Sequence, residues 1–148
     1  MYTHWQRTFP HPAMLAFDAP SREECTCERP KSNIPQQALV LLNDPTYVEA
    51  ARAFAARILR ECSGDAAQRV AWAYRQALGR EPRADELATV GALLVKHSAT
   101  YTSDSEAAAA LVKTGLTPLS KDVNVSELAA WTSVARVILN LHETITRS

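Results

Sequence analysis

Polar side chains able to do acid–base or binding chemistry gather between residues 18 and 43. Two carboxylates, Asp18 and Glu23, lie in one loop, and paired carboxylates carry out the hydrolysis of glycosidic bonds. Their spacing in a loop sets no distance between them, so the pair is only a weak catalytic candidate. The weak binding candidates of this segment are Arg22, Asn33, Gln37 and Asn43. Such residues also cap helices and tie loops together, and both interpretations stay open.

A second polar line lies near the end of the chain. Ser133, Arg136, Asn140 and Glu143 follow one another at steps of three, four and three residues, so on a helix they form one narrow edge. Arg136 and Asn140 are weak candidates for lining a binding groove, and Glu143 is a weak catalytic candidate. The alternative is a solvated edge on which Glu143 pairs with Arg147, worth only a few tenths of a kcal/mol.

The cysteines do not form a recognisable cofactor motif. Cys25, Cys27 and Cys62 are an odd number without the spacing of a disulfide framework. Cys25 and Cys27 are weak zinc candidates, with His4 or His11 as further ligands, but ordinary thiols are the default interpretation. Covalent haem attachment requires C-x-x-C-H, which the chain lacks, so we expect no metal and no cofactor in this chain.

Composition excludes several classes of protein. The 148 residues carry 16 basic and 16 acidic side chains, which argues against the basic surface of a nucleic-acid binder. No apolar run approaches the roughly 18 to 20 residues of a membrane span. The chain has 25 alanines and only 10 aromatic residues, which favours closely packed helices over a bulky β-sandwich core.

From Pro35 onward the sequence predicts an all-α fold, an irregular bundle of about five to six helices. The last helix has apolar residues on all sides but its polar edge, so we expect it to be central. Residues 1–34 read as an extended, proline-rich arm and residues 35–148 as the helical domain. The predicted helices are a short buried one at 36–43, then 45–62, 66–78, one after Pro82, an alanine-rich one opened by a capping box at 103–106, and 126–142.

Several separated motifs carry a family resemblance. They are FDAPSREEC at 17–25, NIPQQALVLLNDP at 33–45, AAW at 129–131 and LNLHETITR at 139–147. With these motifs in this order, the chain resembles the C-terminal part of the planctomycete cytochrome c-associated proteins, whose closing domain is the domain of unknown function 1553. Cys27 and Glu28 depart from the family pattern, which weakens any anion-binding role for that loop.

The resemblance implies a larger exported protein, in the periplasm or cell envelope, with a c-type haem in an upstream domain. On this view residues 1–34 are the remainder of an upstream domain and Met1 is an internal position. Our leading hypothesis is a non-catalytic helical module for packing or protein interaction. Its partners would be the missing N-terminal region, another protein, or a second copy. The competing hypothesis is part of the active site of an envelope hydrolase or redox enzyme acting on polysaccharide.

Overall fold

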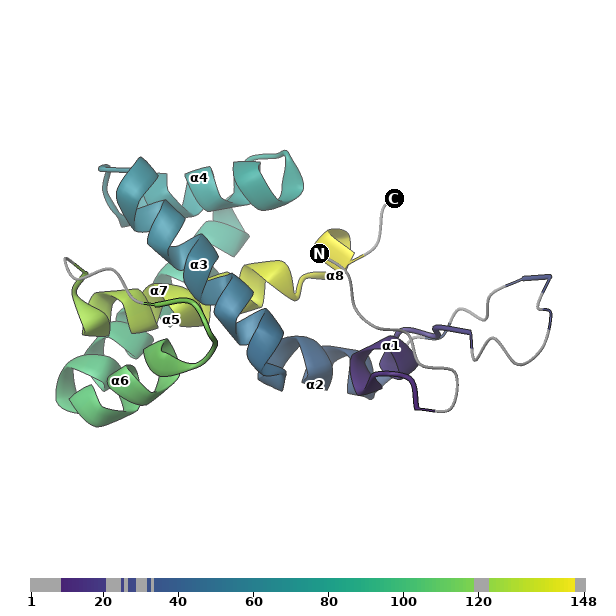
Figure 1. Cartoon of the computed structure of the whole chain (residues 1–148). Coiled ribbons are helices and arrows are strands. Elements are labelled where there is room, and N and C mark those ends of the chain that lie inside the picture. Colours follow the sequence, from purple (N-terminus) through teal and green to yellow (C-terminus); the bar gives the residue numbers. More distant parts are fainter. Residues whose placement is uncertain are drawn as a thin grey trace. The chain divides into compact units, whose positions relative to one another are not determined.

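The computed structural model describes residues 9–20, 25, 27–28, 32, 34–118 and 123–145 (Figure 1). Within these ranges it contains eight helices and no strand, which confirms the all-α class. The chain divides into two compact units, residues 1–44 and residues 45–148. The helices are α1 Pro12–Ala16, α2 Pro35–Asn43, α3 Pro45–Glu61, α4 Ala66–Leu78, α5 Ala84–Ser103, α6 Ser105–Lys113, α7 Val125–Leu139 and α8 His142–Ile145.

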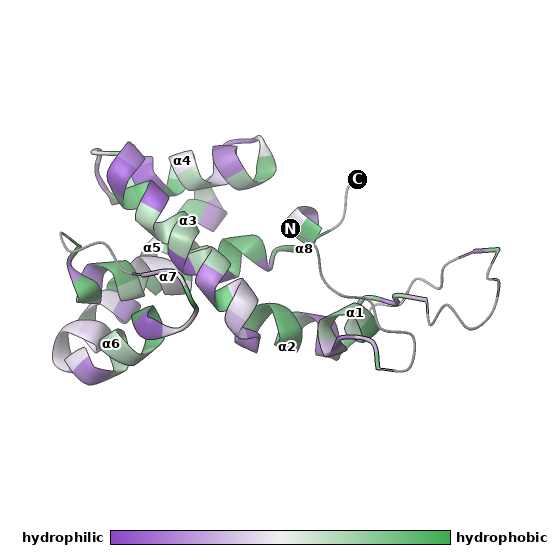
Figure 2. Cartoon of the chain, in the orientation of Figure 1, coloured by the Kyte–Doolittle hydropathy of each residue, from purple (hydrophilic) through white to green (hydrophobic). Residues whose placement is uncertain are grey.

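The N-terminal unit is built on two short helices that pack against each other. Residues 1–34 are not extended throughout, because Pro12 occupies the first turn of α1 and the His11 side chain accepts a hydrogen bond from the Ala13 amide. The expectation that α2 is buried is wrong. None of its residues is buried, although Figure 2 shows a hydrophobic stretch in the middle of α2. A five-residue partner helix is too short to enclose it.

The second unit is a bundle arranged around α7. Residues 128–135 are all buried, as is Ile138, and α7 packs against α3, α4, α5, α6 and α8. The central position predicted for the last helix is therefore confirmed. Ala129, Ala130 and Ala135 are fully buried, and such small side chains let neighbouring helices approach closely. No helix in the described ranges has the length and hydrophobicity needed to cross a membrane.

Polar caps fix the ends of these helices. The Asp65 side chain accepts from the Gln68 amide at 2.8 Å, and the Gln68 side-chain oxygen accepts from the Asp65 amide at 3.1 Å. Gly79 ends α4 at a φ of 72°. Asn124 caps α7, because its side-chain oxygen accepts from the Glu127 amide at 3.2 Å. The cap of α6 is Asp104 and not the expected Ser103, because the Asp104 carboxylate accepts from the Ala107 amide.

The last helix also ends earlier than predicted. α7 stops at Leu139, and Asn140, with φ −97° and ψ 5°, donates its amide back to the Arg136 carbonyl. The short helix α8 then begins at His142. The break separates Glu143 from the polar edge of α7, so the predicted line of four residues does not lie on one continuous helix.

Candidate functional site

The polar residues of the N-terminal unit form a loop-tying cluster in which Asp18 accepts from Ser32. The Asp18 carboxylate accepts from the Ser32 amide at 2.7 Å, and the Ser32 hydroxyl bonds both of its oxygens at 2.7 and 2.8 Å. Gln37 donates to the Ser32 carbonyl at 3.0 Å. Asp18 itself has a φ of 55°, a conformation that Asp adopts more readily than most residues. The Asp18–Ser32 bonds join positions 14 residues apart, as expected of a structural cluster.

The remaining N-terminal candidates do not assemble around Asp18 in the part of the chain that the structure describes. Asn43 donates to the Leu39 carbonyl one turn earlier, and Cys25 and Cys27 are exposed free thiols. Arg22, Glu23 and Asn33 lie outside the described residues, so the geometry of the predicted carboxylate pair stays a prediction. Among the described residues, no three His, Cys, Asp or Glu side chains are grouped as metal ligands.

The polar edge of α7 meets α5 in a half-buried seam. The Tyr101 and Ser133 hydroxyls are 3.1 Å apart, and the His97 ring stacks on Tyr101 with centroids 5.8 Å apart. Burial lowers the pKa of His97, and the charges of Lys96 and Arg136 lower it further. His97 therefore favours its neutral form.

Asn140 and Arg136 lie at the other end of that edge. The Asn140 side-chain oxygen is buried and has no hydrogen-bond partner among the described residues. Arg136 is half-buried one turn before it. Their places on one edge agree with the sequence analysis, but the binding role predicted for them stays a prediction.

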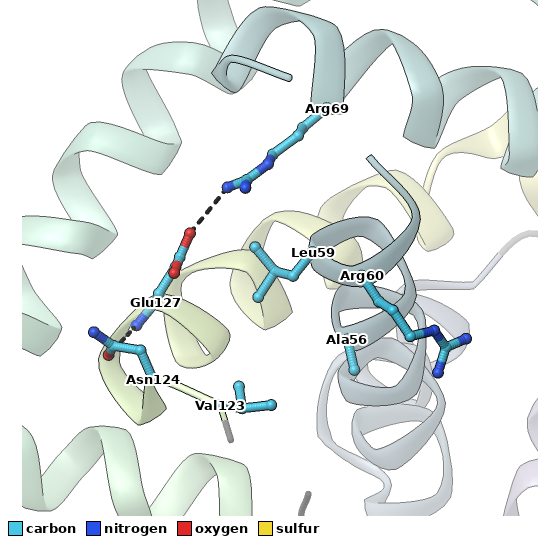
Figure 3. Close-up of a pocket in the computed structure, with 7 residues that line it drawn as sticks. All are labelled: Ala56, Leu59, Arg60, Arg69, Val123, Asn124 and Glu127. Carbon is cyan, nitrogen blue, oxygen red and sulfur yellow. Dashed lines mark hydrogen bonds and ion pairs between the residues drawn. The ribbon is translucent and has the colours of Figure 1, made fainter. Parts of the chain in front are cut away.

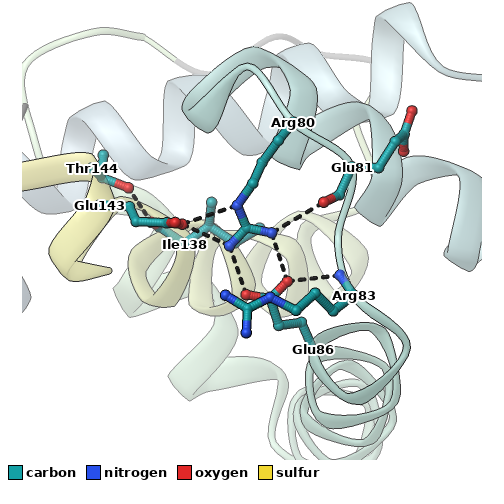
Figure 4. Close-up of polar contacts among 7 residues, drawn as sticks. All are labelled: Arg80, Glu81, Arg83, Glu86, Ile138, Glu143 and Thr144. Atoms are coloured by element: carbon teal, nitrogen blue, oxygen red, sulfur yellow. Dashed lines mark hydrogen bonds and ion pairs between the residues drawn. The ribbon is translucent and has the colours of Figure 1, made fainter. Parts of the chain in front are cut away.

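Glu143 belongs to an ionic network centred on Arg80 (Figure 4). Arg80 donates to Glu143 at 2.6 Å and 3.1 Å, and to the two carboxylate oxygens of Glu86 at 2.7 and 2.8 Å. Glu86 also accepts from the Arg83 amide at 2.7 Å, at the start of α5. Hydrogen bonds from Arg80 and from Arg83 lower the pKa of Glu86 to about 2. This network ties the α4–α5 turn to α8.

A second ionic contact involves a buried arginine of α3. Arg52 is buried and donates to the carbonyls of Val112 at 2.7 Å and Thr117 at 2.8 Å. Glu49 accepts from the amides of Leu116 at 3.0 Å and Thr117 at 2.7 Å. Hydrogen bonding by Thr117 and the Leu116 backbone, with the Arg52 charge, lowers the pKa of Glu49 to about 2. We call Glu49 and Arg52 the α3 clamp, since they hold residues 112–117 against α3.

Two adjoining pockets lie beside α3. The larger, of about 480 Å³, is lined by α3, by Arg69 of α4 and by the start of α7; Figure 3 shows Leu59 and Val123 at its apolar side and the Arg69–Glu127 ion pair at its polar side. The second, of about 340 Å³, continues toward Thr117 and Pro118. Both pockets share Ala56, Arg60 and Val123.

Trp72 borders the same face of the bundle. Its ring stacks on Phe54 with centroids 6.2 Å apart, and the Arg57 guanidinium lies 5.7 Å from the ring centroid. Trp72 is half-buried against the core, so these contacts are made within the bundle.

Comparison with known proteins identifies one match. The family model PSD1, described as a protein of unknown function (DUF1553), matches residues 1–94. The match includes the motifs at 17–25 and 33–45 and ends within α5, while the motifs at 129–131 and 139–147 lie beyond it. No curated protein and no solved structure matches the chain.

Proposed function

The chain belongs to the PSD1 family of proteins of unknown function (DUF1553), and we propose that it is a non-catalytic interaction module. The N-terminal unit carries this proposal because its described residues include almost no buried apolar side chain. Ala16 is its only buried hydrophobic residue among those described, whereas Phe9 is 76% and Leu39 57% exposed. An apolar helix that its own unit does not cover supports a role in binding another protein segment.

The bundle supplies the stable support that such a module needs. Its core includes residues from α3, α4, α5, α6 and α7, so it does not depend on the N-terminal unit for buried apolar area. The candidate carboxylates favour the same reading: Asp18 is engaged by Ser32, and Glu143 by Arg80. No observation among the described residues favours a hydrolase or redox site.

The wider context of the module rests on the family resemblance alone. The resemblance to cytochrome c-associated proteins supports a place in a larger exported protein, with c-type haem carried by a different domain. The natural partner is then another part of that protein. Extending the gene's reading frame upstream and searching it for C-x-x-C-H checks this context independently of the binding experiment.

Dye binding and oligomeric state test the proposal. We expect the full chain to bind a hydrophobic dye such as ANS, or to self-associate in size-exclusion chromatography with light scattering. Leu39→Glu places a charge on α2 and is expected to reduce both signals. Val95→Glu is the matched control, since Val95 is 70% exposed on α5 of the bundle. A dye-negative monomer with full amide protection over residues 9–44 would contradict the proposal.

A further inference from the structure

The two pockets beside α3 form one groove on the bundle, separate from the N-terminal unit. We define the α3 groove as all the residues that line one or both of these pockets. Its apolar side is made by Ala56, Leu59, Val123 and Leu128. Its charged side is made by Arg52, Arg57, Arg60 and Arg69, together with Glu127, which pairs with Arg69. The groove therefore offers an apolar surface flanked by more cations than carboxylates.

The arginines of the groove outnumber their acidic partners. Arg52 pairs with Glu49 and Arg69 with Glu127, while Arg57 and Arg60 share the single carboxylate of Glu61. Four arginines faced by three glutamates leave one net positive charge. The Arg60 side chain is 71% exposed and lines both pockets, so its guanidinium is accessible to a further carboxylate.

One wall of the groove is held in a fixed conformation. The α3 clamp bonds the backbone of residues 112–117, and Thr117 and Pro118 line the smaller pocket. Leu116 lies in the same turn, directly before Thr117 in the chain, and 97% of its surface is exposed to solvent. An apolar side chain on a turn anchored by four hydrogen bonds is pre-organised for contact, which lowers the ordering cost of binding.

The length of the groove selects an extended occupant. From Arg52 to Arg60 the helix rises ~12 Å, at about 1.5 Å per residue. An extended peptide advances about 3.3 Å per residue, so ~4 of its residues match that length. Alternating side chains of such a peptide point to opposite sides, which suits apolar contacts on one face and carboxylates toward the arginines.

We propose that the α3 groove binds an extended acidic peptide segment that carries apolar side chains, with Arg57 and Arg60 receiving its carboxylates. This site is independent of the proposed role of the N-terminal unit, because every residue that lines it belongs to residues 45–148.

A binding titration tests the proposal on the full chain. The probe is a fluorescein-labelled hexapeptide of alternating Glu and Leu, followed by fluorescence anisotropy. An alternating Lys and Leu peptide tests whether charge sign matters. We expect the acidic peptide to bind and the basic one not to bind, with affinity falling as salt is raised because salt screens exposed charges.

Variants locate the site. Arg57→Gln with Arg60→Gln is expected to weaken binding about tenfold, whereas Arg75→Gln with Arg83→Gln removes the same charge elsewhere and should change it less than about twofold. If circular dichroism shows that the double variant is misfolded, the single variant Arg60→Glu replaces it, because Arg60 is at an exposed position. This variant should weaken peptide binding at least as much. Leu39→Glu should leave binding unchanged.

Three results would overturn the inference: no acidic-peptide binding up to ~1 mM, equal binding of the basic peptide, or wild-type affinity in the Arg57 and Arg60 variants. Each is independent of the dye experiment on the N-terminal unit.

Discussion

The two units of the chain both contain apolar helices, yet among the described residues only the bundle has a cluster of buried side chains. In the bundle, α7 is enclosed by α3, α5 and α6, with α4 and α8 at its sides, and its residues 128–135 are all buried. In the N-terminal unit, α2 also carries several apolar residues, but its partner among the described helices of that unit is the five-residue α1, and none of its residues is buried. Hydrophobic residues therefore produce a core only where several helices are long enough to surround them. Stability is expected to reside in the bundle and contact with other chains in the N-terminal unit.

Removing a core side chain of the bundle should cause the largest loss of stability. Ile138→Ala leaves a cavity beside α7 and is expected to lower the free energy of unfolding by about 2–5 kcal/mol. Leu39→Ala makes a comparable truncation on exposed α2 and should cost less than about 0.5 kcal/mol. Urea unfolding of the full chain, followed by circular dichroism, measures both. Similar losses for the two variants would show that α2 belongs to the same core.

The α3 clamp should give the next largest effect. Arg52→Met keeps the buried aliphatic volume but leaves the Val112 and Thr117 carbonyls without their charged donor, at an expected cost of about 2–3 kcal/mol. Arg75→Met, at a surface ion pair with Glu81, should cost less than about 0.5 kcal/mol. Equal unfolding curves for the two variants would mean that the clamp does not stabilise the bundle.

Acid should weaken the bundle through two carboxylates. The pKa values of Glu49 and Glu86 are lowered from 4.5 to about 2, so their contribution is complete above pH 4.5 and is lost as the pH falls toward 2. The double variant Glu49→Gln with Glu86→Gln should be less stable at neutral pH and show a flatter decline between those values. Glu106→Gln, at an exposed position on α6, is the control. If the free energy of unfolding falls equally steeply with decreasing pH in the double variant and in the wild-type chain, Glu49 and Glu86 are not the source of the acid sensitivity.

The smallest effect is expected in the N-terminal unit. Asp18→Asn replaces a carboxylate that accepts from both the amide and the hydroxyl of Ser32. We expect faster amide exchange at Ser32, measured by hydrogen–deuterium exchange, and a change of less than about 0.5 kcal/mol in bundle unfolding. A large loss of bundle stability would show that the two units fold as one.

The helical class and much of the bundle could be predicted from sequence because local rules decide them. Pro45, Asp65, Gly79 and Asn124 each act through the backbone of their own turn, and the apolar periodicity of the last long helix indicated a central place. Ser103 and Asp104 were both able to cap α6, and the Asp104 carboxylate is the group that accepts from the Ala107 amide.

Long-range contacts could not be predicted in this way. Glu49 and Arg52, three residues apart on α3, have the pattern of an ordinary surface ion pair, and no local signal indicates carbonyls sixty residues later. The network of Arg80 depends on α8 reaching the α4–α5 turn, which the uninterrupted helix predicted for 126–142 did not allow. The pockets likewise arise from the packing of helices distant in sequence.

The central place of α7 also sets the order in which the molecule can be made. During synthesis the chain emerges from its N-terminus, so α3 to α6 are complete before the helix they enclose has left the ribosome. The 94 residues that define the family match lack that helix entirely. A nascent chain must therefore keep the inner faces of α3, α5 and α6 from aggregating until α7 has been synthesised, and the bundle is expected to fold only after that helix has emerged.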